Sequence, residues 1–228
     1  VTGLTNLGTV NGAERMMLSG DGAWLALDST VDLDPGDTNG NRDIYLAPVG
    51  DRPTFTPATN GDDDSSHPVL SHDGRFVFFV SSATDLVTGD DNGARDLFMI
   101  DRDPDANGTF DEGGNNVISR LVAAGTGAIA DEAPSTTGDG VFIAFAATGA
   151  GIVNDVNDGH QAQIFVHNRL TGETVLVSRG TDDLPADGPC STPVLSPGAT
   201  FVGFASGGFN MPDASGFPST YVAPNPLN

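Results

Sequence analysis

Short apolar runs alternate with polar, turn-forming segments along the chain, and one such unit occurs four times. The four copies are LSGDGAWLALDS (residues 18–29), LSHDGRFVFFVSS (70–82), TTGDGVFIAFAA (136–147) and LSPGATFVGFAS (195–206). The apolar run in each copy is only four or five residues long, which is too short for a helix and typical of a β-strand. A D-G pair precedes three of the runs and predicts two-residue hairpin turns with positive φ at Gly22, Gly74 and Gly140.

The distance between the copies predicts a repeat architecture. Counted from Asp21, Asp73, Asp139 and the aligned Gly198, the spacings are 52, 66 and 59 residues, as in propeller blades or solenoid coils. Further strand-like runs are DIYLAPV from residue 43, DLFMID from 96, VISRLV from 117, QIFVHN from 163, TVLVSR from 174 and STYVAP from 219. Pro-led segments such as HPVLS (67–71) supply a strand before the turn. Four short strands per unit predict an all-β fold, a β-propeller of four-stranded antiparallel blades.

The second unit follows a known pattern closely, with PVLSHDGRFVFFVSS (68–82) leading to RDLFMIDRD (95–103). These segments resemble the WD40-like β-propeller repeat (PD40) of the TolB-like superfamily, and the resemblance covers nearly the whole chain. Gln163 and Ser219 stand where the family has Asp, and SPGAT (196–200) replaces its SPDGR turn. The resemblance implies the propeller fold. It says little about function, because the family includes periplasmic scaffolds, enzyme accessory domains and binding proteins.

We expect a single propeller domain over residues 1–228. Its blades are expected at about 11–59, 60–125, 126–181 and 182–228, the last completed by residues 1–10. The fourth repeat lacks an outermost strand, and LTNLGTV at residues 4–10 offers a spare one. Pairing of this segment with the strand that contains Tyr221 and Val222 would close the ring and hide both edges. The alternative is a piece of a larger propeller, completed by further sequence or by another subunit.

Charge narrows the range of partners. The chain carries 27 Asp, 4 Glu, 9 Arg and no Lys, which gives a formal net charge of −22. A field of this sign repels phosphate backbones and anionic membrane surfaces, so nucleic acid is not expected as a partner. No segment approaches the roughly 20 apolar residues of a membrane span, so direct membrane insertion is not expected either. The excess of Asp over Glu is typical of turns and of loops that bind cations, with a halophilic origin as the alternative.

The strongest chemical motif is the insertion IDRDPDANGTFDEGGNN at residues 100–116. Read from Asp103, it places oxygen-bearing side chains at positions one, three, five and nine around a glycine, Gly108, at position six. Ca²⁺ takes six to eight oxygen ligands, and such spacing wraps a single ion. Gly114 stands where an EF-hand has its bidentate Glu. The predicted calcium ligands are the side chains of Asp103, Asp105, Asn107 and Asp111, the carbonyl of Thr109, and Glu112 as a substitute sixth partner. A solvated hairpin tip is the alternative.

Two shorter loops share part of this motif, GDTNGNRD (36–43) and GDDNGARD (89–96). Each offers D-x-N-G-x-x-D and is one carboxylate short. The weaker candidate calcium ligands are Asp37, Asn39, Asp43, Asp90, Asn92 and Asp96. Asn-Gly also forms turns without any metal, and the closing Asp can hydrogen-bond to the backbone instead.

Local signatures of catalysis are missing from the sequence. There is no G-x-S-x-G elbow, Walker loop, G-x-G-x-x-G after a strand or H-E-x-x-H,. The four His residues are scattered, and Cys190, the only cysteine, is expected to be a buried and inert thiol. Aspartates of different blades can still meet at a central channel and act as acid and base.

The sequence favours a non-catalytic, calcium-stabilised β-propeller outside the cytoplasm, either extracellular or periplasmic. We expect it to act as a scaffold or a protein-interaction module, with a protein partner or a larger assembly. Whether the protein is an enzyme stays open. The alternatives are a carbohydrate-active hydrolase or lyase with an acidic site at the channel, and an accessory propeller of a longer enzyme.

Overall fold

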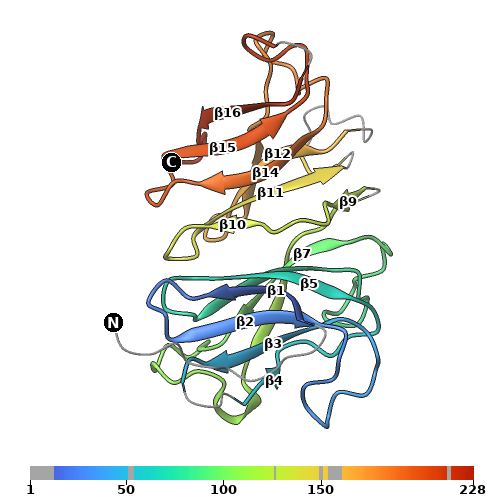
Figure 1. Cartoon of the computed structure of the whole chain (residues 1–228), viewed down its shortest axis with the longest axis vertical. Helices are drawn as coiled ribbons and strands as arrows, with labels where there is room; N and C mark the ends of the chain where they lie inside the picture. The colour runs from blue at the N-terminus through green and yellow to red at the C-terminus, as the bar shows by residue number, and fades with distance from the viewer. Residues whose placement is uncertain (1–12, 51–53, 126, 149–150, 154–160, 215–216) are drawn as a thin grey trace.

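The fold is built from four antiparallel β-sheets that follow one another along the chain. The computed structural model describes residues 13–50, 54–125, 127–148, 151–153, 161–214 and 217–228. Figure 1 shows the sheets stacked along the long axis of the molecule, with the first sheet at the bottom and the fourth at the top. Within these residues, no helix is long and apolar enough to cross a membrane. The predicted all-β propeller architecture is confirmed.

Each sheet forms one blade of the fold. Blade 1 contains β1 (Ala13–Leu18), β2 (Trp24–Ser29), β3 (Asp43–Pro48) and β4 (Thr56–Pro57). Blade 2 contains β5 (Ser65–Leu70), β6 (Phe76–Ser81), β7 (Asp96–Asp101) and β8 (Val117–Val122), with the 3₁₀ turn η1 (Glu112–Gly114) before β8. Blade 3 contains β9 (Ala128–Ile129), β10 (Ser135–Thr136), β11 (Phe142–Thr148), β12 (Gln163–Asn168) and β13 (Glu173–Leu176). Blade 4 contains β14 (Cys190–Leu195), β15 (Phe201–Ser206) and β16 (Ser219–Pro224).

The repeated D-G turns have the predicted glycine conformation but a different turn geometry. The φ angles of Gly22, Gly74 and Gly140 are 72°, 78° and 66°. The Gly74 amide donates to the Ser71 carbonyl at 3.1 Å, so the glycine is the last residue of a four-residue turn. The prediction of a two-residue hairpin loop was therefore wrong. Asp73 is not among the residues with positive φ, and its carboxylate accepts the Ser71 hydroxyl at 2.7 Å. The fourth copy places Ala199 at φ 55°.

Apolar side chains alternate along the strands and pack the blades face to face. Between blades 2 and 3, Phe78 and Val80 share a core with Ile143 and Phe145. Equivalent cores join blade 1 to blade 2 and blade 3 to blade 4. Blade 1 also has a buried face away from blade 2, where the apolar residues cluster around Phe55. Each inner blade is therefore covered on both faces.

The outer face of blade 4 has no such cover. Val194, Phe201 and Val222 are 60 %, 47 % and 68 % exposed. In the repeat alignment, Val222 corresponds to Leu46 in blade 1 and Met99 in blade 2, which are only 2 % and 8 % exposed. Among the residues that the structure describes, no strand of blade 1 pairs with a strand of blade 4. The predicted closing segment, residues 4–10, lies outside the described residues.

Candidate functional site

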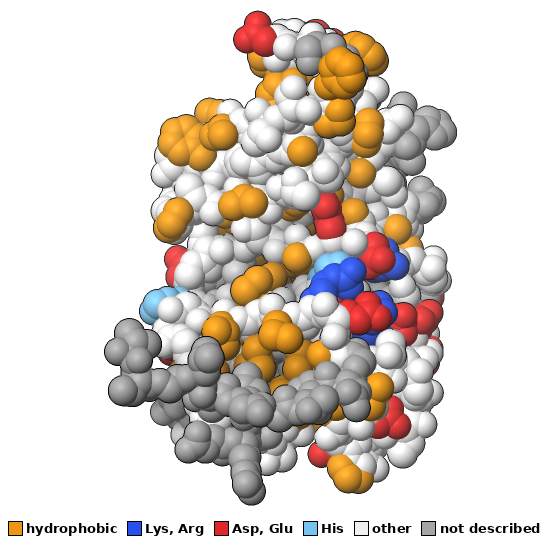
Figure 2. Space-filling model, in the orientation of Figure 1, with side chains coloured by type: hydrophobic (Ala, Val, Ile, Leu, Met, Phe, Trp, Pro, Cys, Tyr) orange, Lys and Arg blue, Asp and Glu red, His pale blue; other side chains and the backbone are white. Residues whose placement is uncertain are grey.

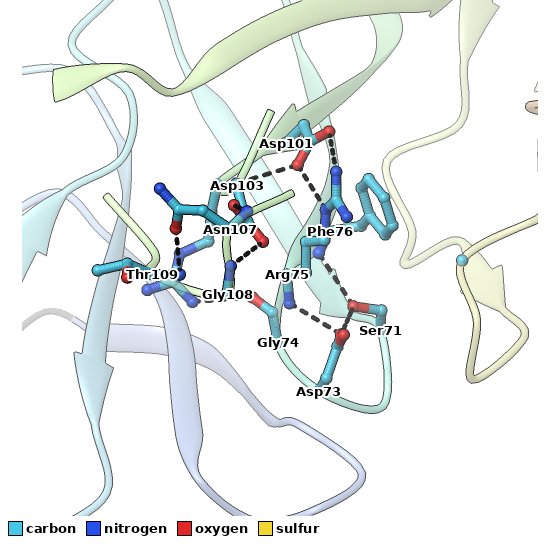
Figure 3. Close-up of polar contacts among 12 residues, drawn as sticks. Ser71, Asp73, Gly74, Arg75, Phe76, Asp101, Asp103, Asn107, Gly108 and Thr109 are labelled. Carbon is cyan, nitrogen blue, oxygen red and sulfur yellow. Dashed lines mark hydrogen bonds and ion pairs between the residues drawn. The ribbon is translucent and has the colours of Figure 1, made fainter. Parts of the chain in front are cut away.

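The predicted calcium loop joins β7 to β8 and lies against the D-G turn of its own blade (Figure 3). Asp101, the last residue of β7, accepts two hydrogen bonds from the Arg75 guanidinium, at 2.8 and 2.9 Å. Burial raises the pKa of Asp101, but the hydrogen bonds from Arg75 and from the Asp103 amide outweigh this and hold the pKa below its usual value,. The start of the loop is therefore fixed by an ion pair inside blade 2.

Hydrogen bonds close the loop around Asp103. Its two carboxylate oxygens accept the backbone amides of Asn107, at 2.9 Å, and Gly108, at 3.0 Å. Gly108 has a φ of 87°, which confirms that the glycine makes the sharp turn. The Thr109 amide donates to the Asn107 side-chain oxygen at 2.8 Å. Asp103 is buried, so its hydrogen bonds order the loop from within.

The Asn107 amide group brings two further predicted ligands together. Its nitrogen donates to Asp105 at 2.9 Å and to Glu112 at 2.6 Å. Asp103, Asp105, Asn107 and Glu112 therefore form one cluster at the tip of the loop. Calcium would need the side-chain oxygen of Asn107 to face Asp105 and Glu112 in place of the nitrogen.

Asp111, another predicted ligand, is directed elsewhere. It forms a close ion pair with Arg102, whose guanidinium also donates to the Gly74 carbonyl at 2.8 Å. The guanidinium carbon lies 3.7 Å from the centre of the Trp24 ring of blade 1. Arg102 is 1 % exposed, and a buried guanidinium needs a carboxylate partner. Arg102 could not be singled out from the sequence, because no local pattern shows that its side chain turns inward.

In the loop at residues 89–96, two buried carboxylates share one arginine. Arg120, from β8, donates to Asp90 at 2.7 Å and to Asp96 at 3.1 Å. Asn92 donates to both oxygens of Asp96, at 3.1 and 3.0 Å. Burial and the nearby charge of Asp96 raise the pKa of Asp90 despite Arg120,. The three predicted ligands do come together, around a guanidinium.

Among the residues that the structure describes, no arginine bridges the two carboxylates of the loop at residues 36–43. The Tyr45 hydroxyl donates to Asp37 in a short hydrogen bond, and the Thr59 hydroxyl donates to Asp43 at 2.8 Å. Asn39 donates to the other oxygen of Asp43 at 2.9 Å. Burial raises the pKa of Asp43, because these hydrogen bonds do not fully compensate for lost solvation,. Neutral hydrogen-bond donors therefore satisfy the carboxylates of Asp37 and Asp43.

Within the described ranges, no group of three or more His, Cys, Asp or Glu side chains is placed to hold a metal ion. Calcium also uses amide and backbone carbonyl oxygens as ligands, so its binding by the three loops stays a prediction.

A cluster of mixed charge links blades 1, 2 and 3, and no motif indicated it. His67 is buried on β5 with a φ of 60°, and its amide donates to Asp28 of blade 1 at 3.0 Å. Its Nδ1 lies 3.4 Å from Asp131 and 3.0 Å from the Ser66 hydroxyl. Both contacts use one ring nitrogen, so the group is not a Ser-His-Asp relay. Burial and the charge of Arg15 lower the pKa of His67.

Figure 2 shows basic side chains gathered with a histidine and several acidic side chains in one part of the face in view, and hydrophobic side chains scattered over the rest. Cys190, on β14, is buried as expected. Burial raises the pKa of its thiol, which disfavours the reactive thiolate.

Protein-family models give no match to the sequence, and no curated protein matches it. Solved structures do match. TolB from Acinetobacter baumannii is 18 % identical with a TM-score of 0.54, over 95 % of this chain and 43 % of that chain. A putative TolB from Agrobacterium tumefaciens is 20 % identical with a TM-score of 0.59, over 97 % and 70 %. The chain has a TolB-like β-propeller fold.

The same fold occurs in a puromycin-hydrolyzing peptidase from Mycobacterium tuberculosis, which is 16 % identical with a TM-score of 0.61. The match covers 96 % of this chain and 28 % of the peptidase. This TolB-like chain thus spans less than half of the Acinetobacter protein and less than a third of the peptidase. At these identities the likeness shows the fold, and the same fold carries different functions.

Proposed function

We propose that this protein is a non-catalytic TolB-like propeller that binds a protein partner and acts as a scaffold within a larger assembly outside the cytoplasm. The observation that carries the proposal is the outer face of blade 4. Val194, Phe201 and Val222 are exposed there, although the equivalent face of each other blade is covered by the next blade. An exposed apolar sheet face typically marks an interaction site, which a partner protein or a further propeller blade can cover.

The charge distribution supports a specific contact at this face. The sequence of its strands, CSTPVL, FVGFAS and STYVAP, contains no charged residue. The whole chain has a net charge of −22. A partner can therefore approach the face without desolvating a carboxylate, which is the costly part of forming an interface.

Site-specific crosslinking tests this role. A photoreactive residue at Val222 should crosslink a discrete partner in an extract of the native source, and the additional substitution Phe201→Asp should abolish the product. Val117, also exposed but located on blade 2, is the matched control position. Equal crosslinking at both positions, or none at Val222, would contradict the proposal.

We further propose that calcium stabilises the loop at residues 103–112. Support comes from the convergence of Asp105 and Glu112 on Asn107, which places two carboxylates and an amide within reach of one ion. Asp103, whose two oxygens accept backbone amides of the loop, is the third carboxylate of the proposed ligand set. Asp111 stays with Arg102, so the ligand set is smaller than the sequence predicts.

Calorimetric titration of the chelated protein should show calcium uptake. At about 100 times the dissociation constant, linkage adds roughly 2.7 kcal/mol to the free energy of unfolding. Asp105→Ala should remove most of the uptake, because it deletes a carboxylate that no arginine holds. Asp213→Ala, an exposed acid of blade 4, should leave it unchanged. Unaltered uptake by Asp105→Ala would show that calcium binds elsewhere.

A further inference from the structure

The loop between β7 and β8 contains a second motif, which calcium binding does not require. Asn107, Gly108 and Thr109 form an N-x-[ST] triplet, and the sequence contains no other such triplet. In proteins that leave the cytoplasm, this triplet is the acceptor of N-linked sugars and is typical of surface loops. The place of the triplet in the structure therefore decides whether it can be used.

The triplet lies at the exposed tip of the loop. All residues from 104 to 109 are exposed, whereas Asp103 at the base is buried. The tip is neither helix nor strand, and Ala106 and Gly108, on either side of Asn107, have positive φ angles of 56° and 87°. A Cβ added at Gly108 would meet no heavy atom within 4 Å. An enzyme can therefore reach Asn107 from solvent without opening the blade.

The side-chain amide of Asn107 is oriented so that its nitrogen is available. Its oxygen accepts the Thr109 amide at 2.8 Å, and Figure 3 shows the nitrogen directed away from this hydrogen bond. The nitrogen donates to Asp105 and Glu112, which are both exposed, so water can replace these hydrogen bonds at little cost. Among the described residues, the Thr109 hydroxyl has no hydrogen-bond partner and is also free to be recognised.

The loop at residues 89–96 has the same turn without the motif. Asn92 accepts the amide of Ala94 at 2.9 Å, and Ala94 has no hydroxyl. The Asn92 nitrogen donates to both oxygens of Asp96, at 3.1 and 3.0 Å, and Asp96 is fully buried. Asn107 therefore differs from Asn92 both in the residue that follows the glycine and in the freedom of its nitrogen.

We propose that Asn107 is a site of N-linked glycosylation. A transferase recognises the Thr109 hydroxyl and brings the Asn107 nitrogen to a sugar that is activated by a phosphate group. A bond forms between Nδ2 and C1 of the sugar while the bond between C1 and the phosphate oxygen breaks. The phosphate leaves with the bonding electron pair, and Nδ2 gives up one proton to a base of the transferase. The inference goes beyond the proposed function and rests only on its location outside the cytoplasm.

The folded loop can carry the sugar. Asp103 holds the backbone amides of Asn107 and Gly108, and the reaction leaves both amides intact. The modified Nδ2 keeps one N–H, which is enough for a hydrogen bond to Asp105 or Glu112. The loop belongs to blade 2, and blade 3 separates it from blade 4 (Figure 1). The sugar therefore leaves the proposed partner contact free.

Transfer of a sugar to the full chain in vitro tests the site. The folded chain is incubated with a purified oligosaccharyltransferase and a lipid-linked oligosaccharide, in calcium-free buffer so that the Asn107 oxygen stays on the backbone. After denaturation, trypsin releases DPDANGTFDEGGNNVISR (residues 103–120), and mass spectrometry should find the sugar on Asn107. Absence of the sugar from this peptide would overturn the proposal. A modified chain that crosslinks no partner at Val222 would refute the proposed function and leave the glycosylation site standing.

Three variants show whether the triplet and the exposed tip are both needed. Thr109→Ser keeps the hydroxyl and should be modified like the wild type, whereas Thr109→Val keeps the shape and should lose the sugar. Ala94→Thr is the matched control, because it gives Asn92 the same triplet while its nitrogen stays on Asp96. In the folded chain Asn92 should be modified about tenfold more slowly than Asn107, since its loop must open first. Sugar on Thr109→Val, or equal rates at the two asparagines, would contradict the assignment.

Discussion

The loops at residues 36–43 and 89–96 share a sequence pattern, yet their buried carboxylates have different partners. In blade 2, Arg120 reaches both Asp90 and Asp96. In blade 1, the aligned pair Asp37 and Asp43 is satisfied by hydroxyl and amide groups. The two repeats therefore place the acidic residues at the same positions, but different side chains donate hydrogen bonds to them.

The strand registers show which residues provide the donor in each blade. Tyr45 pairs with Pro57 in blade 1, and the aligned Phe98 pairs with Arg120 in blade 2. A tyrosine beside a proline thus stands where blade 2 has a phenylalanine beside an arginine. Either combination provides one donor for the first Asp of the loop, so the pair of positions acts as a unit.

Removing Arg120 should have the largest effect on the free energy of unfolding. Arg120→Leu leaves Asp90 and Asp96 buried without their cation, which should lower the free energy of unfolding by about 3 kcal/mol. Urea denaturation followed by circular dichroism measures the change. Arg95→Leu is the control: its ion pair with the exposed Asp131 is 3.9 Å long, so it should cost less than about 0.5 kcal/mol. Equal costs for the two variants would show that blade 2 does not depend on the cation.

Removing the hydroxyl in blade 1 should cost less. Tyr45→Phe leaves Asp37 without its hydroxyl donor and should lower the free energy of unfolding by about 2 kcal/mol. Tyr221→Phe is the matched control, since its hydroxyl has no hydrogen-bond partner among the described residues, and it should stay within about 0.5 kcal/mol of the wild type. If both variants unfold at the same urea concentration, the short Tyr45–Asp37 contact does not stabilise blade 1.

Giving blade 1 the donor residues of blade 2 should have the smallest net effect on the free energy of unfolding. The double variant Tyr45→Phe, Pro57→Arg gives blade 1 the residues of blade 2, and the new guanidinium should recover about half of the loss of roughly 2 kcal/mol caused by Tyr45→Phe. Pro57→Arg alone should change little. A double-mutant cycle in urea measures the coupling, and strict additivity would mean that the two positions are independent.

Much of the fold could be predicted because it depends on local chemistry. The D-G turns and the short apolar strands repeat in the sequence, and the strands that they predict are present. The turn geometry was mispredicted, since the side-chain hydrogen bond from Ser71 to Asp73 competes with the two-residue hairpin that D-G usually forms.

In the candidate sites, too, only contacts between residues close in sequence could be predicted. The spacing of Asp103, Asn107 and Gly108 correctly predicts a loop that closes on itself, because these residues are neighbours. The partners that define the sites are distant in sequence: Arg120 is 30 residues from Asp90, and Trp24 belongs to another blade than Arg102. Donors that arrive from another strand or another blade are set by packing, which the local spacing of acids does not encode.

The outer face of blade 4 also bears on the colloidal behaviour of the protein. Exposed apolar side chains such as Phe201 and Val222 favour self-association, and two copies of this chain meet there only if their net charges of −22 allow it. The acidic remainder of the surface therefore provides a long-range repulsion that opposes contact between the uncharged strands of two copies,. Salt weakens that repulsion, because the Debye length falls from about 10 Å at 0.1 M to about 3 Å at 1 M. Ionic strength thus sets how readily two copies of the chain associate through this face.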